Sequence, residues 1–352
     1  MTTGKLTVFA LLLGAMSLSC SQERSLSPQP TDWVVYAAGW NFRQIYILDA
    51  DSLSVVDSIP FRGSPLLMGT NPSGEYLYVW SDNRGIVPPG TYIFDTKEKN
   101  LVHYSAVSLG RTRFASHGRL LIRNSTYYEG EPLTRTYFCD PLTLTALDSL
   151  PDNLQFRDAL NQGDTILVQE RGSGNLRLLD LETGRMTGLY TASTRQAYMW
   201  YARVAPDGRS AAIVSDGAIE IGDLLTGEIL MSVRSRGPGQ VDISPDGSHA
   251  IVSTPILDAW FEASPSRLYL FDLRNRVLAA YLEGFSESND LECGGLCSFL
   301  PDGTRALVGA IDGWNYGPLQ VFDAKSGSII RWIDLPTEDS DVRCFGVGRA
   351  PK

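Results

Sequence analysis

The chain has 352 residues, of which 43% are hydrophobic, and it carries a formal net charge of −10 at pH 7. An acidic chain repels nucleic-acid phosphates and anionic lipid head groups. The charge balance therefore argues against nucleic-acid binding and against electrostatic attachment to a membrane.

The N-terminal residues have the pattern of an export signal. After a positive start, Leu6–Met16 is an apolar run that is too short to span a membrane, and small residues precede Cys20. Cys20 resembles the lipid acceptor of bacterial lipoproteins, although Ser17 stands where that motif usually has Leu. We expect a signal peptide over residues 1–19, a lipidated Cys20 with a tether over residues 20–32, and a location at the bacterial cell envelope. Secretion without a lipid is the alternative.

An internal repeat organises the chain from residue 33 to residue 352. Seven short apolar stretches each run into an Asp and then a turn, at intervals of about 40 to 50 residues. This period is typical of one four-stranded antiparallel sheet per repeat, and it predicts an all-β, seven-bladed β-propeller. We expect the carboxylates to accept hydrogen bonds from the turn amides rather than to catalyse a reaction. These residues are Asp49, Asp95, Asp140, Asp180, Asp223, Asp272 and Asp323.

Each repeat divides into four strands, a to d. The first repeat lacks its strand a, and the chain ends on a strand a that has no b, c or d after it. A Pro-Asp-Gly turn recurs between strands a and b, because Pro presets the first turn residue and Gly accepts a positive φ. The chain begins on a strand b, Trp33–Ala38, and ends on a strand a, Val342–Val347. The last strand is therefore predicted to pair with the N-terminal strands b, c and d, which closes the ring and removes its exposed edges.

These features resemble the YVTN-type family of seven-bladed propellers, which are related in shape to WD40 proteins. The resemblance rests on the Pro-Asp-Gly turns and the apolar-Asp ending of strand c, and it extends from Trp33 to about Arg349. The Tyr-Val-Thr-Asn signature of the family is present only loosely, as in Val35–Ala38. The resemblance implies the fold, whereas function does not transfer, because propellers include binding proteins, lactonases and quinoproteins.

Loop length differs between the two faces of the expected ring. The d-to-a and b-to-c connections share one face and include several long loops, whereas the a-to-b and c-to-d turns share the other and are uniformly short. Aromatic side chains bury large areas at low entropic cost, and Arg supplies polar pairing, so we predict a binding surface on the long-loop side. For single rings, capping of blade-to-blade contacts is the alternative. The candidates are Trp40, Tyr128, Trp200, Trp260, Trp314, Tyr316, Arg111, Arg236 and Arg343.

Cysteines and carboxylates offer two further candidate features. Cys293 and Cys297 flank Gly-Gly-Leu and are candidates for a small disulfide loop, with two unpaired thiols as the alternative. A group of carboxylates has the oxygen ligands that Ca²⁺ prefers, but we favour solvated loops and expect neither a metal site nor a cofactor. The group comprises Asp290, Glu292, Glu338, Asp339 and Asp341.

Two function classes follow from these patterns. We favour a noncatalytic exported propeller, a monomer, that binds a protein, peptide or glycan on its long-loop side. The alternative is an exported lactonase-like hydrolase or quinoprotein-type oxidoreductase with its site at the central channel. No Gly-x-Ser-x-Gly, HExxH or phosphate-loop motif occurs, so no catalytic residue is nominated. An Arg, Asp and His cluster at the channel would favour the enzyme, and a broad aromatic patch the binding protein.

Overall fold

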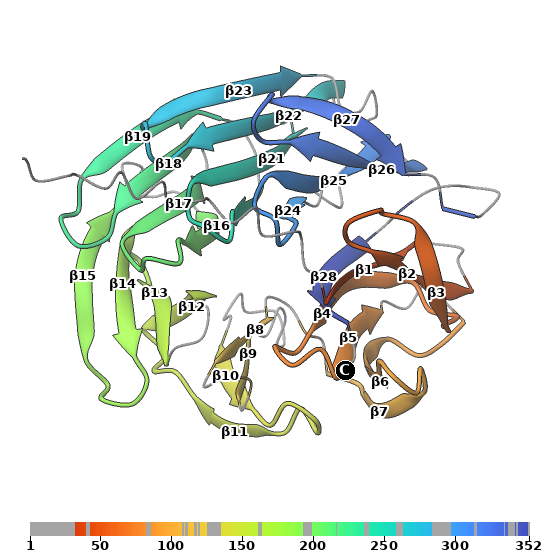
Figure 1. The fold of residues 1–352 in the computed structure, drawn as a ribbon. Helices are drawn as coiled ribbons and strands as arrows, with labels where there is room; N and C mark the ends of the chain where they lie inside the picture. The colour runs from red at the N-terminus through yellow and green to blue at the C-terminus, as the bar shows by residue number, and fades with distance from the viewer. Residues whose placement is uncertain are drawn as a thin grey trace, which may run out of the picture. The chain divides into compact units, whose positions relative to one another are not determined.

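The strands of the chain assemble into seven four-stranded sheets, which are the blades of a propeller (Figure 1). The computed structural model describes residues 32–39, 43–81, 86–107, 109, 112–115, 118, 120–124, 135–160, 164–192, 199–215, 217–235, 239–257, 263–283, 297–312, 315–333, 335–336, 342 and 344–350. None of the described residues forms a membrane-spanning helix. The predicted all-β, seven-bladed fold is confirmed.

Each blade runs outward from an inner strand a to an outer strand d, and all neighbouring strands are antiparallel. Blade 1 contains β28 (Cys344–Arg349), β1 (Trp33–Ala38), β2 (Gln44–Asp49) and β3 (Val55–Pro60). Blade 2 contains β4 (Pro65–Thr70), β5 (Tyr76–Ser81), β6 (Gly90–Asp95) and β7 (Leu101–Ser105). Blade 3 contains β8 (Thr112–Ala115), β9 (Leu120–Asn124), β10 (Thr136–Cys139) and β11 (Ala146–Ser149).

The remaining four blades follow in chain order. Blade 4 contains β12 (Leu154–Ala159), β13 (Thr165–Glu170), β14 (Asn175–Asp180) and β15 (Met186–Thr191). Blade 5 contains β16 (Met199–Val204), β17 (Ser210–Ser215), β18 (Ala218–Asp223) and β19 (Ile229–Arg234). Blade 6 contains β20 (Gln240–Ile243), β21 (His249–Leu257), β22 (Ala263–Asp272) and β23 (Val277–Glu283). Blade 7 contains β24 (Cys297–Phe299), β25 (Arg305–Asp312), β26 (Asn315–Asp323) and β27 (Ser328–Ile333).

The two ends of the chain close the ring, as predicted. β28 pairs with β1 from Trp33↔Arg349 to Ala38↔Cys344, and the N–H of Ala350 donates to the carbonyl of Asp32 at 2.6 Å. The strand begins and ends two residues later than the expected Val342–Val347. The reason is the register with β1, which carries the pairing to Arg349, and the Arg349 guanidinium lies over the Trp33 ring at 5.6 Å from its centroid.

The core lies between the blades rather than at the centre of the ring. Successive side chains of a strand point to opposite sides of its sheet, so one strand contributes side chains to the interfaces with both neighbouring blades. In β1, Val35 packs with Leu307 and Leu319 of blade 7, whereas Tyr36 packs with Leu77 and other residues of blade 2. Equivalent apolar clusters fill the other five junctions of the described chain. This packing joins each blade to the next around the ring.

The Asp residues that end the c strands cap the following turns, as predicted. Oδ1 of Asp180 accepts hydrogen bonds from the N–H groups of Glu182 at 3.0 Å and Thr183 at 2.8 Å. The N–H of Thr183 is the main reason that the pKa of Asp180 lies below its ordinary value. The other six carboxylates accept turn amides in the same way: Asp49, Asp95, Asp140, Asp223, Asp272 and Asp323.

One position of these c-to-d turns strains the backbone in some blades. The residue four places after the capping Asp has a positive φ in every blade, and it is Gly184 with a φ of 68° in blade 4 but Arg276 with a φ of 55° in blade 6. A side chain is disfavoured in this left-handed region. We expect Arg276→Gly to raise the free energy of unfolding by about 1 kcal/mol, measured by chemical denaturation.

The control for that variant is the reverse change at Gly184, which has no atom within 4 Å of an added Cβ. Gly184→Ala should therefore lower the free energy of unfolding by a similar amount through backbone strain alone. Destabilisation by Arg276→Gly would contradict the prediction and would mean that the exposed Arg276 side chain makes stabilising contacts.

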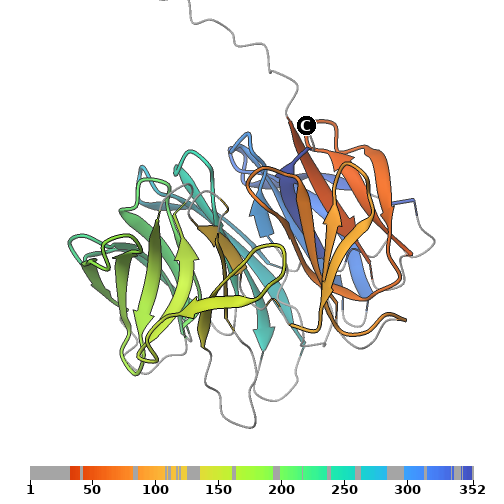
Figure 2. The same cartoon turned by 90° about the horizontal axis from the view of Figure 1, so that it is seen from below.

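The two faces of the ring differ in their connections, as predicted. The strands run between the faces (Figure 2), so the a-to-b and c-to-d turns share one face, here called the tight-turn face. The b-to-c and d-to-a connections share the other, the long-loop face, and include residues 193–198 and 284–296. The described chain starts at Asp32, beside the a-to-b ends of β28 and β1, so the polypeptide enters the ring at the tight-turn face.

Two neighbouring blades extend their b-to-c hairpins on the long-loop face. β21 and β22 of blade 6 have nine and ten residues, and β25 and β26 of blade 7 have eight and nine, whereas β17 and β18 of blade 5 have six each. The extra pairs include Leu257↔Ala263 and Asp312↔Asn315, each beyond a β-bulge. Bulges twist and re-aim strands. Among the strands that the structure describes, the hairpin stems of blades 6 and 7 therefore continue farthest toward this face.

Candidate functional site

The inner strands carry one equivalent position in every blade. In five blades the a-to-b turn is closed by an N–H that donates to the first residue of strand b, from Asn71, Leu160, Ala205, Ser244 and Leu300. In blade 1, which has no such turn, the N–H of Ala350 donates to Asp32 at the corresponding place. In blade 3, Ala115 pairs with Leu120 at the corresponding place. The residue two places before each of these is called a belt position. The seven belt positions are Gly69, Arg113, Asp158, Arg203, Asp242, Ser298 and Gly348.

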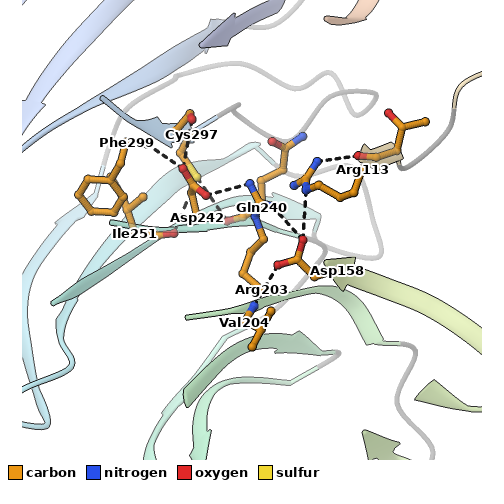
Figure 3. A network of polar contacts seen from close by, with 11 residues as sticks. Arg113, Asp158, Arg203, Val204, Gln240, Asp242, Ile251, Cys297 and Phe299 are labelled. Atoms are coloured by element: carbon orange, nitrogen blue, oxygen red, sulfur yellow. Dashed lines mark hydrogen bonds and ion pairs between the residues drawn. The ribbon is translucent and has the colours of Figure 1, made fainter. Parts of the chain in front are cut away.

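Asp158 of blade 4 joins three neighbouring blades. Its Oδ1 accepts from Nε of Arg113 in blade 3 at 3.1 Å and from Nη1 of Arg203 in blade 5 at 3.0 Å (Figure 3). Its Oδ2 accepts the backbone N–H of Val204 at 3.0 Å. The Asp158 side chain is only 3% exposed. Both of its oxygens are thus occupied by donors of the adjacent blades.

Asp242 of blade 6 repeats this arrangement one step farther along the ring. Its Oδ1 accepts from Nη2 of Arg203 at 2.9 Å, and its Oδ2 accepts from the N–H of Phe299 at 2.8 Å and from the hydroxyl of Ser298 at 3.1 Å. Arg203 therefore lies between two carboxylates (Figure 3). The belt positions of blades 3 to 7 form one continuous chain of charged and polar contacts.

Electrostatics distinguish the two arginines of this belt. Burial lowers the pKa of Arg203, but the charges of Asp158 and Asp242 outweigh that effect, so the pKa lies above its ordinary value. Burial lowers the pKa of Arg113 to about 10, and the positive charge of Arg203 contributes to the decrease. Both side chains remain cationic near neutral pH. Arg113, at the end of the belt, is the less compensated cation of the two.

Next to this belt, Cys297 begins β24 with a buried thiol. Its Sγ lies 3.6 Å from the carbonyl oxygen of Gln240 and 3.8 Å from that of Ile251. Burial, with the charge of Asp242, raises the pKa of the thiol to about 12. The thiol is therefore protonated at neutral pH and is a packing group rather than a nucleophile. It is free in this structure, while Cys293 lies outside the described residues, so their pairing stays a prediction.

The side chains of the predicted binding residues lie outside the part of the chain that the structure describes. For Trp200 in β16 and Tyr316 in β26 the backbone is described, but not the side chain. The other predicted residues, Trp40, Tyr128, Trp260, Trp314, Arg111, Arg236, Arg343 and the acceptor Cys20, lie outside it altogether. The carboxylates proposed for Ca²⁺, Asp290, Glu292, Glu338, Asp339 and Asp341, also lie outside it. Within the described ranges no three His, Cys, Asp or Glu residues gather as a metal site.

The charged belt was missed in the sequence, although a signal for part of it exists. Arg203, Asp242 and Ser298 each stand three residues before the Pro of a Pro-Asp-Gly turn, so counting back from the turns aligns them. Arg113 and Asp158 precede turns that lack Pro. Their equivalence becomes visible only in the strand register.

Comparisons with known proteins support the fold class, a β-propeller, and nothing narrower. No family model matches the chain, and no curated protein matches it. A functionally unknown protein from Desulfotomaculum acetoxidans is 13% identical with a TM-score of 0.60, and the match covers 90% of this chain and 99% of that one. The β-propeller domain of Cps50 (Swd1) from Myceliophteria thermophila is 12% identical with a TM-score of 0.54, and the match covers 81% and 90%.

An enzyme is also among the similar structures. The dihydro-heme d1 dehydrogenase NirN is 16% identical with a TM-score of 0.52, and the match covers 88% of this chain. This chain spans 65% of the length of that dehydrogenase. At such identities the likeness shows the fold alone, so the similar structures leave binding and catalysis undecided.

Proposed function

We propose that the protein is an exported, membrane-anchored binding propeller, noncatalytic and monomeric, that captures a protein, peptide or glycan on its long-loop face. The observation that carries the proposal is that the N-terminal entry of the chain and the extended hairpins lie on opposite faces of the ring. The chain enters the ring at the tight-turn face beside Asp32, whereas the extended hairpins of blades 6 and 7 continue toward the other face. A lipid on Cys20 would attach the protein to a membrane through a segment that joins the ring on the side away from the extended hairpins.

The composition of the hairpin connections supports the same surface. Residues 258–262 join β21 to β22 and include Trp260, and residues 313–314 join β25 to β26 and include Trp314. Tryptophan is among the residues that dominate binding energy at protein interfaces. A rigid paired stem is also a more exact support for a binding residue than a long unpaired loop. Membership of the YVTN-type propellers is part of this proposal, and it bears on the fold rather than on the function.

The charged belt is assigned a bracing role rather than a catalytic one. Each oxygen of Asp158 and Asp242 already accepts at least one hydrogen bond from the protein. A general acid or base needs a lone pair or proton within reach of substrate. The occupied carboxylates instead connect neighbouring blades, which keeps the inner wall and the hairpin stems in place.

The proposal is tested with residues 21–352 carrying Trp260→Ala and Trp314→Ala together. Binding is measured on arrays of defined glycans and of random-sequence peptides. We expect wild type to bind one class and the double variant to lose at least about tenfold in affinity, since buried tryptophans at interfaces commonly contribute about 2 kcal/mol or more.

Trp332→Ala is the matched control, because Trp332 lies 53% exposed on the outer strand β27. It should bind as wild type does, and all three proteins should melt at similar temperatures. Undiminished binding by the double variant would exclude the two hairpins as the binding surface. A large fall in its melting temperature would show that the two rings are packing residues.

A further inference from the structure

The belt positions alternate in charge from blade 3 to blade 6, but the belt position of blade 2 carries no charge. In blades 4 and 6 the belt Asp reaches the next blade and accepts two groups there, the side chain at the belt position and the backbone N–H of the residue after it. Asp158 accepts from Arg203 and Val204, and Asp242 accepts from Ser298 and Phe299. By this rule, blade 2 would need an Asp beside Arg113 and Phe114 of blade 3. It has Gly69 instead.

Among the described residues, none fills the space in front of Gly69. A Cβ added to Gly69 would have no atom within 4 Å. The equivalent glycine of blade 1, Gly348, is different, because a Cβ there would collide with the side chain of Thr70. Close packing therefore explains the glycine in blade 1 and does not explain the one in blade 2.

Arg113 has hydrogen-bonding capacity that no described residue uses. Its Nε shares Oδ1 of Asp158 with Arg203, and its Nη1 donates to the carbonyl of Thr112 on its own strand at 2.8 Å. Its Nη2 has no acceptor among the described residues, and the side chain is 41% exposed. Arg203, by contrast, donates to two carboxylates. A guanidinium with a free edge suits the planar, paired oxygens of a carboxylate or the oxygens of a phosphate.

We propose that the oxyanion of a small ligand, a carboxylate or a phosphate, binds in front of Gly69, where it accepts hydrogen bonds from Arg113 and the N–H of Phe114. The anion takes the place that an Asp at residue 69 would occupy and continues the belt by one step. Phe114 follows Arg113 as Val204 follows Arg203, so its N–H is the equivalent donor. This site is separate from the long-loop face and does not depend on the function proposed for that face.

The test is thermal unfolding of residues 21–352 in rising inorganic phosphate or succinate, with chloride added to keep the ionic strength constant. A ligand that binds only the folded state raises the midpoint by an amount that grows with the logarithm of one plus the ratio of the ligand concentration to Kd. We expect wild type to respond to one or both anions. Arg113→Gln should weaken the response about tenfold or more, because it removes a charged hydrogen-bond donor. A response to phosphate alone or to succinate alone assigns the group that the ligand carries.

Gly69→Asp is the decisive variant. It supplies the missing carboxylate, so it should raise the midpoint in chloride alone and abolish the response to both anions. Arg185→Gln, which removes an exposed charge from a c-to-d turn of blade 4, should respond as wild type does. An unchanged response in Gly69→Asp or in Arg113→Gln would mean that the protein binds an adventitious ion only, and no response in wild type would overturn the proposal. Titration calorimetry with the same anions gives the affinities directly if Arg113→Gln unfolds early.

Discussion

Replacing Asp158 by Ala is expected to lower the free energy of unfolding by about 3 kcal/mol, because removing a buried carboxylate leaves its cationic partners less compensated. Three donors lose their acceptor at once: the guanidinium groups of Arg113 and Arg203 and the N–H of Val204. We expect the lower end of the usual range, since Arg203 keeps its hydrogen bond to Asp242. Urea denaturation measures the change.

Asp152 supplies the control for this prediction. It forms an ion pair with Arg135 at 3.2 Å, but the two side chains are 71% and 55% exposed. An exposed pair of this kind contributes about 0 to 1 kcal/mol, so Asp152→Ala should change the free energy of unfolding very little. If Asp158→Ala cost no more than Asp152→Ala, the belt would be a solvated row of charges and could not brace the blades.

Deleting residues 342–352 is expected to abolish cooperative folding of the whole ring. The deletion removes β28, exposes the edge of β1, and takes Val342, Cys344 and Phe345 out of the core. Burial of each large apolar side chain contributes about 1.5 to 3 kcal/mol, and the six strand pairs are lost as well. The sum is on the order of the total stability of a typical domain. Circular dichroism during heating should show a broad, non-cooperative transition in place of a sharp one.

A circular permutant separates loss of the strand from loss of the C-terminus. The N–H of Ala350 already bonds to the carbonyl of Asp32, so residues 342–350 can be moved in front of residue 32 and joined to it by a copy of the turn 206–209. The permuted chain should regain the cooperative transition. A truncated protein that still melted sharply would show that blade 1 is stable with three strands and that closure contributes little.

The propeller could be predicted because its determinants are local. The capping carboxylate of Asp180 and the turn residues after it are close neighbours in the sequence, so each repeat can be identified from its own residues. Ring closure was equally accessible, since the chain starts on a strand b at Trp33 and ends on a strand a. Only the bounds of that last strand differed, because pairing partners set them and propensity does not.

The belt could not be predicted in the same way, because it depends on distant residues in register. Asp158 contacts Arg113 and Arg203, each 45 residues away, and the turns after Arg113 and Asp158 lack the Pro that would have aligned them. The predicted aromatic surface is a different case. The aromatic composition of the loops predicts Trp260 and Trp314 as binding residues. The structure shows the paired strands to which residues 258–262 and 313–314 connect.

Ring closure also determines how the protein would carry a mechanical load. A pull on Asp32 along the strand direction acts on β1, which is hydrogen-bonded to β28 on one side and to β2 on the other. Such a force acts in shear on the hydrogen bonds of both strand pairs, β1 with β28 and β1 with β2, at once. The load is therefore shared among many hydrogen bonds. A pull across the strands would instead open the ladders one rung at a time. The N-terminal attachment and the ligand proposed above would thus load the ring in its mechanically strong direction.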